Sequence, residues 1–298
     1  MNQSRGVELS VQRLTKRFNR QVLAVNDLSF SVLPGRVTGF LGPNGSGKST
    51  TLRCVLGLVH ATDGHALIGG QPYAELDHPG RIVGASLESN SYHPARSGRN
   101  HLRVVADAIG VPKVRVDECL AMVGLDAAAG RKVGGYSLGM RQRLGLATAM
   151  LGDPDVLVLD EPANGLDPEG IAWLRTLLRH LASEGRTVLV SSHLLTEVSN
   201  TVDDVVIINN GALVKAGPMS ELIASPGVRV RSPRIAELSQ LAQRSDGVAC
   251  SAPDGDAVVI TGMSAAALGE LAHANSIPLH ELTASGTDLE RIFLELTS

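Results

Sequence analysis

The chain has 298 residues, of which 43% are hydrophobic but only 3% aromatic, so its core must be built from aliphatic side chains. Its formal net charge of -3 argues against a nucleic-acid partner, because such proteins usually carry a basic stripe. Cys54, Cys119 and Cys250 match no disulfide or metal-ligand spacing and suit a reducing compartment. No apolar run approaches the ~18 residues of a spanning helix, and the first residues lack the apolar core of a signal peptide. We therefore expect a cytoplasmic protein.

Two strand-like segments open the chain, at residues 7–14 and 28–32, and a polar stretch around Phe18 lies between them. Phe18 could staple a turn. Its ring could also stack on a nucleotide base, since aromatic faces serve that purpose in proteins. The residues alone leave both interpretations open.

The segment Gly42–Thr50 fits the phosphate-binding pattern G-x-x-x-x-G-K-[ST]. An apolar strand precedes it and a helical segment follows it, which is the context that this pattern requires. The glycines let the backbone wrap a phosphate, and the helix N-terminus adds positive partial charge. The expected ATP-binding residues are Gly42, Pro43, Asn44, Gly45, Ser46, Gly47, Lys48, Ser49 and Thr50. Lys48 would reach the β- and γ-phosphates and Ser49 would bind Mg²⁺. The alternative is a glycine-rich turn that matches by chance.

A helical pattern replaces the short β-type segments from residue 97 to about residue 133. We interpret His101 and the arginines around it as a solvated face rather than a ligand site. Apolar runs at 155–159 and 187–192, separated by a helical stretch, predict parallel strands that are buried on both faces.

Acidic and imidazole side chains follow these two strands, where α/β sheets bind ligands. Asp160 and Glu161 come after the first strand, and His193 comes after the second. Asp160 would hold Mg²⁺ directly or through water, and Glu161 could polarise the attacking water. Such a pair can also be a helix cap or a salt-bridge partner, but the upstream Lys48 and Ser49 favour catalysis.

The composition changes after Gly217, and residues 225–227 resemble a linker. The segments that follow have the order βαββαβ, which predicts a small ferredoxin-like sandwich. A last helix is expected over residues 288–296. We therefore expect an ATP-binding domain at residues 1–224 and a small α+β domain at residues 225–298.

Three further motifs make a family resemblance specific. The segment 136–143, Tyr-Ser-Leu-Gly-Met-Arg-Gln-Arg, resembles the signature motif of ATP-binding-cassette (ABC) proteins. The segment 164–168, Asn-Gly-Leu-Asp-Pro, is similar to their D-loop, and His193 matches their switch histidine. Phe18 falls at the adenine-stacking aromatic of the family. The resemblance covers roughly residues 7–220.

The resemblance implies an α/β P-loop NTPase fold with a RecA-like core, an antiparallel β subdomain and a helical subdomain at about residues 89–152. It implies an ATPase with Glu161 as base and His193 as γ-phosphate sensor. Ser137 and Gly139 would contact the ATP of a second protomer in a homodimer, and Asp167 would lie in the D-loop. The subunit would act on a separate membrane permease at the inner face of the cell membrane.

This sequence departs from the family pattern in two places, and both departures resemble one branch of the family. Leu138 and Met140 replace the first glycine and the glutamine of the common Leu-Ser-Gly-Gly-Gln signature, and Glu88 stands at the Q-loop glutamine. Glu88 could join Ser49 and Asp160 as a Mg²⁺ ligand but cannot donate a hydrogen bond unless protonated. Both departures, and the closing segment, resemble ATPase subunits of bacitracin- and daunorubicin-type drug exporters. We expect an export ATPase whose substrate the sequence does not indicate.

Two other classes of function stay open. A soluble ABC ATPase that acts on ribosomes or DNA is one, although such relatives usually carry two cassettes or a long coiled-coil insertion. A regulatory module that binds ATP without hydrolysis is the other, although Glu161 and His193 argue against it.

Overall fold

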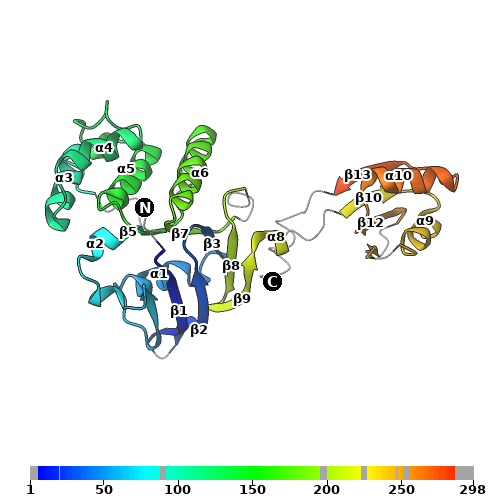
Figure 1. Cartoon of the computed structure of the whole chain (residues 1–298), viewed down its shortest axis with the longest axis horizontal. Coiled ribbons are helices and arrows are strands. Elements are labelled where there is room, and N and C mark those ends of the chain that lie inside the picture. The colour runs from blue at the N-terminus through cyan, green and yellow to red at the C-terminus, as the bar shows by residue number, and fades with distance from the viewer. Residues whose placement is uncertain are drawn as a thin grey trace. The chain divides into compact units, whose positions relative to one another are not determined.

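The described residues form two compact units, and the boundary between these units lies between Met219 and Ser220. The computed structural model describes residues 6–19, 21–87, 92–194, 200–222, 227–245, 247–251 and 255–285. The first unit holds β1 to β9, and the second holds β10 to β13 with α9 and α10 (Figure 1). The boundary expected after residue 224 falls in a segment outside the described residues.

A six-stranded sheet with the order β5-β6-β7-β3-β8-β9 forms the centre of the first unit. Neighbouring strands run parallel except for β9, which is antiparallel to β8. The strands are β3 (Val37–Leu41), β5 (Val83–Ser86), β6 (Val156–Leu159), β7 (Thr187–Ser192), β8 (Asp204–Asn209) and β9 (Ala212–Pro218). Every residue of β3, β6 and β7 is buried, as expected for parallel strands covered on both faces.

A three-stranded antiparallel sheet packs against the central one and is the expected β subdomain. Its strands, in the order β2-β1-β4, are β1 (Leu9–Phe18), β2 (Val22–Val32) and β4 (Asp63–Ile68). One apolar core joins these strands to helix α1 (Lys48–Val55) and to the central sheet. Within it the rings of Phe30 and Phe40 stack with centroids 5.2 Å apart. Helix α6 (Pro168–Ser183) contacts β7 and β3.

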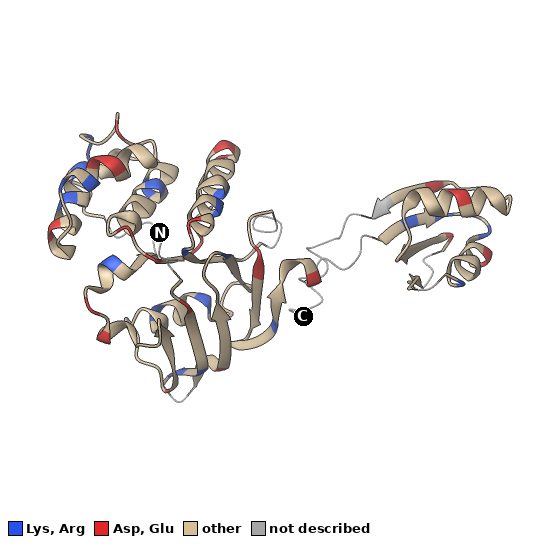
Figure 2. Ribbon diagram, viewed as in Figure 1, with Lys and Arg blue, Asp and Glu red and all other residues tan. Residues whose placement is uncertain are grey.

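The helical subdomain consists of three helices that pack on one another: α3 (Gly98–Ile109), α4 (Val114–Met122) and α5 (Leu138–Met150). Ser97 caps α3 by accepting a hydrogen bond from the N–H of Asn100. Both Arg and Asp/Glu residues occur along α3 and α4 (Figure 2), and Arg99 pairs with Asp117 across these two helices at 2.6 Å. His101 is only 9% exposed, so its predicted solvated position is wrong: its ring packs edge-on against Tyr92.

The second unit is a four-stranded antiparallel sheet with the order β11-β12-β10-β13 and its own apolar core. Its elements are β10 (Gly227–Arg231), α9 (Ile235–Ala242), β11 (Ala249–Cys250), β12 (Ala257–Thr261), α10 (Ala265–Ala274) and β13 (Glu281–Ser285). The order βαββαβ is shared with ferredoxin-like sandwiches. Val228 and Val230 face the core while Arg229 and Arg231 are exposed, the alternation of a sheet with one covered face. The helix expected over residues 288–296 lies outside the described residues.

Short helical turns complete the described chain. They are η1 (Tyr73–Glu75), α2 (Pro79–Ile82), η2 (Val133–Gly135) and α8 (Met219–Leu222). Among the residues with described structure, no helix has the length and apolar character needed to cross a membrane.

Close packing of α5 on β5 depends on Gly84. A Cβ at this position would lie 2.1 Å from the carbonyl oxygen of Ala149 and 2.8 Å from the ring of Pro154. Both neighbours are fixed by the backbone, so neither can rotate away. The glycine therefore lets the helical subdomain approach the edge of the central sheet.

Replacing Gly84 with Ala should destabilise the first unit by about 2 kcal/mol, because an overpacked methyl group must displace backbone. For a unit of this size we expect Tm to fall by about 4–8 °C in calorimetry of the full chain. Gly130→Ala is the matched control, since no atom lies within 4 Å of the Cβ that it would add. Equal Tm values for the two variants would contradict the role assigned to Gly84.

Candidate active site

The loop between β3 and α1 is built on glycines in the left-handed region. Gly45 and Gly47 have φ values of 83° and 103°. A Cβ on Gly47 would lie 2.3 Å from the carbonyl oxygen of Ala24, whereas one on Gly45 would meet nothing within 4 Å. The loop is therefore pressed against β2 at one glycine and leaves open space at the other. Ser46 is buried, and its hydroxyl has no hydrogen-bond partner in the part of the chain that the structure describes.

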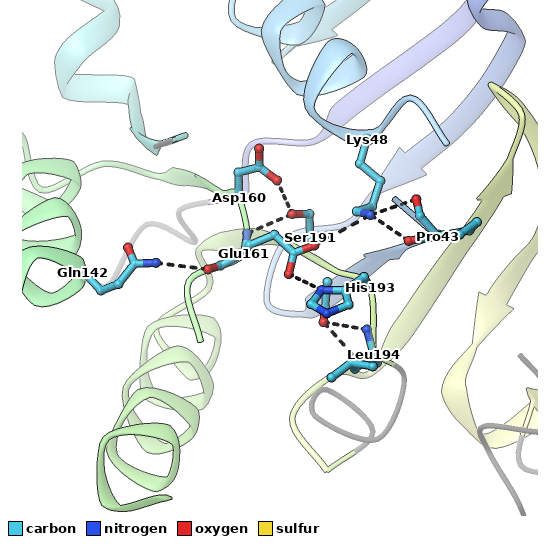
Figure 3. Close-up of polar contacts among 10 residues, drawn as sticks. Pro43, Lys48, Gln142, Asp160, Glu161, Ser191, His193 and Leu194 are labelled. Atoms are coloured by element: carbon cyan, nitrogen blue, oxygen red, sulfur yellow. Dashed lines mark hydrogen bonds and ion pairs between the residues drawn. The ribbon is translucent and has the colours of Figure 1, made fainter. Parts of the chain in front are cut away.

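Lys48 begins α1, and its ammonium group is buried at the mouth of this loop (Figure 3). It donates to the carbonyl oxygens of Gly42 at 2.6 Å and Pro43 at 3.3 Å, and lies 3.7 Å from Oε1 of Glu161. Burial lowers the pKa of Lys48, while the Glu161 and Asp160 carboxylates raise it. The neighbouring Ser49 side chain is exposed.

Two carboxylates follow β6 at the same edge of the sheet. Oδ1 of Asp160 accepts a hydrogen bond from the hydroxyl of Ser191 on β7. Oε2 of Glu161 lies 2.9 Å from Nδ1 of His193, which follows β7. The Glu161 side chain is 20% exposed and that of His193 is 33% exposed, so both can reach a ligand. The structure thus brings Lys48, Asp160, Glu161 and His193 together.

The backbone of Glu161 is strained and is held by side chains. Its φ of 48° is in the left-handed region, which a residue with a Cβ seldom adopts. Its N–H donates to the Ser191 hydroxyl at 2.9 Å, and its carbonyl oxygen accepts from the Gln142 amide at 3.3 Å. No motif assigned a role to Gln142 or Ser191. The position of Ser191 near the carboxyl end of a buried strand, where α/β sheets bind ligands, was an available signal for it.

The signature motif and the D-loop pack on each other within one chain. A Cβ on Gly139 would lie 3.1 Å from the carbonyl oxygen of Gly165. Ser137 is exposed and caps α5 by accepting from the N–H of Met140 at 3.2 Å. Asp167 caps α6 by accepting from the N–H of Gly170 at 2.8 Å. Both motifs therefore present helix N-termini.

The remaining candidates are Phe18 and Glu88. Phe18 ends β1 with 40% of its surface exposed, and the Lys16 ammonium lies 4.8 Å from its ring centroid. An exposed ring at this position is free to stack on a base. Glu88 lies outside the described residues, one position after Leu87.

Comparison with known families and proteins gives a consistent assignment. The ABC transporter family model matches residues 25–164, and a domain of unknown function (DUF8746) matches residues 226–290. The chain is 44% identical over 209 residues to the uncharacterized ABC transporter ATP-binding protein YhcH of Bacillus subtilis (strain 168), covering 69% of this chain and 68% of that protein. It is 41% identical over 212 residues to the bacitracin transport ATP-binding protein BcrA of Bacillus licheniformis. The match covers 70% of this chain and 69% of that protein.

A solved structure of an ATP-binding subunit of an ABC transporter has the same fold, with a TM-score of 0.65 at 27% identity. The match covers 72% of this chain and 91% of that one. The expected RecA-like core, antiparallel β subdomain and helical subdomain are confirmed by this likeness. The chain therefore belongs to the ATP-binding proteins of ABC transporters and is an ATPase of that family.

Proposed function

We propose that this ABC ATPase hydrolyses Mg²⁺-ATP as a homodimer and drives export through a separate permease at the inner face of the cell membrane. The observation that carries the proposal is the Glu161 carboxylate, which lies between the Lys48 ammonium at 3.7 Å and the His193 imidazole at 2.9 Å. Phosphoryl transfer to water needs a group that accepts a proton and a cation that binds phosphate. This edge of the sheet offers both, together with a hydrogen-bonding imidazole.

The residues at this edge fit a bound Mg²⁺. Among the residues with described placement, no cluster of three or more His, Cys, Asp or Glu side chains could hold a metal alone. Mg²⁺ commonly binds through one or two carboxylates together with substrate phosphates, and it would neutralise charge on those phosphates. Asp160 and the exposed Ser49 hydroxyl would be its ligands from the protein, and Glu88 remains a proposed third.

Phosphate binding would change the partners of Lys48. In the structure its ammonium is shared by the Gly42 and Pro43 carbonyls and the Glu161 carboxylate. A triphosphate carries more negative charge than Glu161 and would compete for this cation. Glu161 would then have an oxygen available to accept a proton from the attacking water, while His193 holds the other. Phe18 would stack on the adenine.

A symmetric dimer would complete each site. One chain carries one P-loop and one signature, and a two-fold axis would place Ser137 and Gly139 of one protomer against the ATP of the other. Ser137 and the first N–H groups of α5 suit that position, because a helix N-terminus favours an anion. Asp167, at the start of α6, would lie near the same interface.

The direction of transport is proposed from the relatives. One of them is named as a bacitracin transport ATP-binding protein, and another, in Streptococcus pyogenes, as a lantibiotic transport ATP-binding protein at 35% identity. Export of a toxic or antibiotic molecule by this system fits that likeness. A nucleic-acid-linked ATPase is the second candidate, and no structural observation favours it.

A groove beside the helical subdomain suits a permease segment. It has a volume of about 430 Å³ and lies between the end of α1, the end of β5 and helices α3 and α5. Leu58 at its rim is 66% exposed. Inside it, both ring nitrogens of His101 lack a partner among the described residues, and burial lowers the pKa of this histidine. An apolar segment of the permease would cover Leu58.

Replacing Glu161 with Gln should lower kcat by about 10²–10⁴-fold, the usual contribution of a general base, and leave ATP affinity unchanged. Steady-state hydrolysis and equilibrium dialysis would measure the two quantities. Glu118→Gln is the matched control, since that carboxylate pairs with Arg115 on the surface of α4. Hydrolysis by Glu161→Gln at the wild-type rate would show that Glu161 is not the base.

The trans arrangement predicts complementation between two inactive variants. Ser137→Arg and Lys48→Ala should each be inactive alone, but an equimolar mixture should regain about a quarter of the activity, because half of the dimers have one intact site out of two. Lys48→Ala mixed with Glu161→Gln is the control. Those residues lie 3.7 Å apart in one chain, so no mixed dimer has an intact site. Failure of the first mixture, with mixed dimers shown to form, would place Ser137 outside the shared site.

Leu58→Asp should weaken capture of the permease by about tenfold, because it places a charge in an apolar contact. The ATPase activity of the isolated subunit should not change. Co-purification with the candidate permease, the polytopic membrane protein encoded nearest to this chain, is the measurement. Val114→Asp is the control, since Val114 is 60% exposed on α4 outside the groove. Equal capture of the two variants would exclude the groove.

A further inference from the structure

A single buried hydroxyl joins the two carboxylate residues of the active site. Ser191, in β7, has no exposed surface. Its Oγ is hydrogen-bonded both to Oδ1 of Asp160 and, at 2.9 Å, to the backbone N–H of Glu161 (Figure 3). The parallel register between β6 and β7 produces this arrangement: Leu159 lies opposite Val190, so Asp160 follows beside Ser191.

The direction of both bonds is fixed by chemistry. A backbone N–H can only donate, so the Ser191 oxygen must accept from Glu161. The one hydrogen of the hydroxyl is then left for Asp160, whose carboxylate accepts. A side chain without a group that both donates and accepts, such as that of alanine, cannot serve both partners. Loss of this group would leave the N–H of Glu161 without its acceptor and Oδ1 of Asp160 without its donor.

We infer that Ser191 is a positioning residue for ATP hydrolysis, which holds the Asp160 carboxylate for Mg²⁺ and the Glu161 backbone in its left-handed conformation. The inference rests on the proposed roles of Asp160 and Glu161. With Oδ1 engaged by Ser191, the second oxygen of Asp160 is available for the metal.

Glu161 needs such a restraint. Its φ of 48° is disfavoured for a residue with a Cβ, and a conformation of this kind persists only where the surroundings determine it. Two side chains do so from opposite sides. Ser191 accepts from the N–H, and Gln142 of α5 donates to the carbonyl oxygen at 3.3 Å. The direction in which the Glu161 carboxylate leaves the backbone depends on that conformation.

The two restraints differ in what else they touch, and this difference can be tested. Ser191 contacts both Asp160 and Glu161, whereas the Gln142 amide contacts Glu161. Loss of the Ser191 hydroxyl should therefore weaken Mg²⁺ binding and lower the rate of hydrolysis, while loss of the Gln142 amide should lower the rate alone.

The experiment compares Ser191→Ala, Ser191→Thr, Ser191→Cys and Gln142→Leu in the full chain. Ser191→Ala should lower kcat by about tenfold, the scale of one unpaired buried donor, and leave KM for ATP within about twofold. The free Mg²⁺ concentration that half-saturates binding of a fluorescent ATP analogue should rise by at least about threefold, because Asp160 loses the donor that orients it. Gln142→Leu should lower kcat without changing the free Mg²⁺ concentration that half-saturates nucleotide binding.

The order of ATPase activity among the three Ser191 variants distinguishes a hydrogen-bonding role of this residue from a packing role. Ala is closest to Ser in size, so a packing role predicts that Ser191→Ala is the mildest change. A bridging role predicts that Ser191→Thr, which keeps the hydroxyl, is the most active, that Ser191→Cys is intermediate because S–H is a weak donor, and that Ser191→Ala is the least active. Melting temperatures measured in parallel identify any variant that loses activity by unfolding.

Thr187→Val is the matched control. Thr187 is a fully buried residue of the same strand, and its hydroxyl bonds to the carbonyl oxygen of Val7, away from the carboxylates. This variant should keep kcat and the Mg²⁺ dependence of nucleotide binding. The inference is overturned if Ser191→Ala keeps kcat within about twofold, or if Ser191→Ala is more active than Ser191→Thr at equal stability. A wild-type chain without Mg²⁺-dependent hydrolysis would instead overturn the proposed function itself.

Discussion

The Lys48 ammonium is the buried charge around which the active site is arranged. A lysine out of contact with water is costly unless oxygen atoms surround it, and burial alone lowers its pKa. The carbonyl oxygens of Gly42 and Pro43 and the Glu161 carboxylate supply those contacts. The same cation therefore contacts the carbonyls of the loop and keeps the Glu161 carboxylate, the proposed base, close to it. In the proposed mechanism a triphosphate would replace Glu161 as the anionic partner of Lys48, so that ligand binding and release of the proposed base would be one exchange.

The order of the strands puts the chemistry around this charge. β6, β7 and β3 are neighbours in the central sheet, and all three are parallel. Their carboxyl ends therefore meet at one edge, where the P-loop follows β3, the acidic pair follows β6 and His193 follows β7. Because every residue of these strands is buried, the edge is a rigid platform. Lys48 and Glu161, far apart in the sequence, thus approach to 3.7 Å, and Glu161 and His193 approach to 2.9 Å. The carboxyl ends of parallel strands are where α/β sheets commonly place such groups.

Short motifs predicted the parts of this site, but not how they are connected. The apolar runs before Asp160 and His193 predicted buried strands, and the P-loop pattern identified Lys48, because each depends on local residue types. The left-handed backbone of Glu161 and its bonds to Ser191 and Gln142 depend on the register between β6 and β7 and on the packing of α5, which local patterns do not contain. His101 was misjudged for the same reason: neighbouring arginines suggest a solvated face, whereas burial follows from contact with Tyr92.

Helix α5 connects these parts to the rest of the first unit. Its first residue follows Ser137, the group proposed to act on a second protomer, and Gln142 one turn later bonds to the carbonyl of Glu161. Near its other end, the carbonyl of Ala149 lies against Gly84 of β5, which leads to the proposed permease groove. One helix of 13 residues thus connects these three places. A displacement of the helical subdomain by a partner would therefore either stretch the bond from Gln142 to Glu161 or carry Glu161 with it, and the proposed base would change position or lose a restraint.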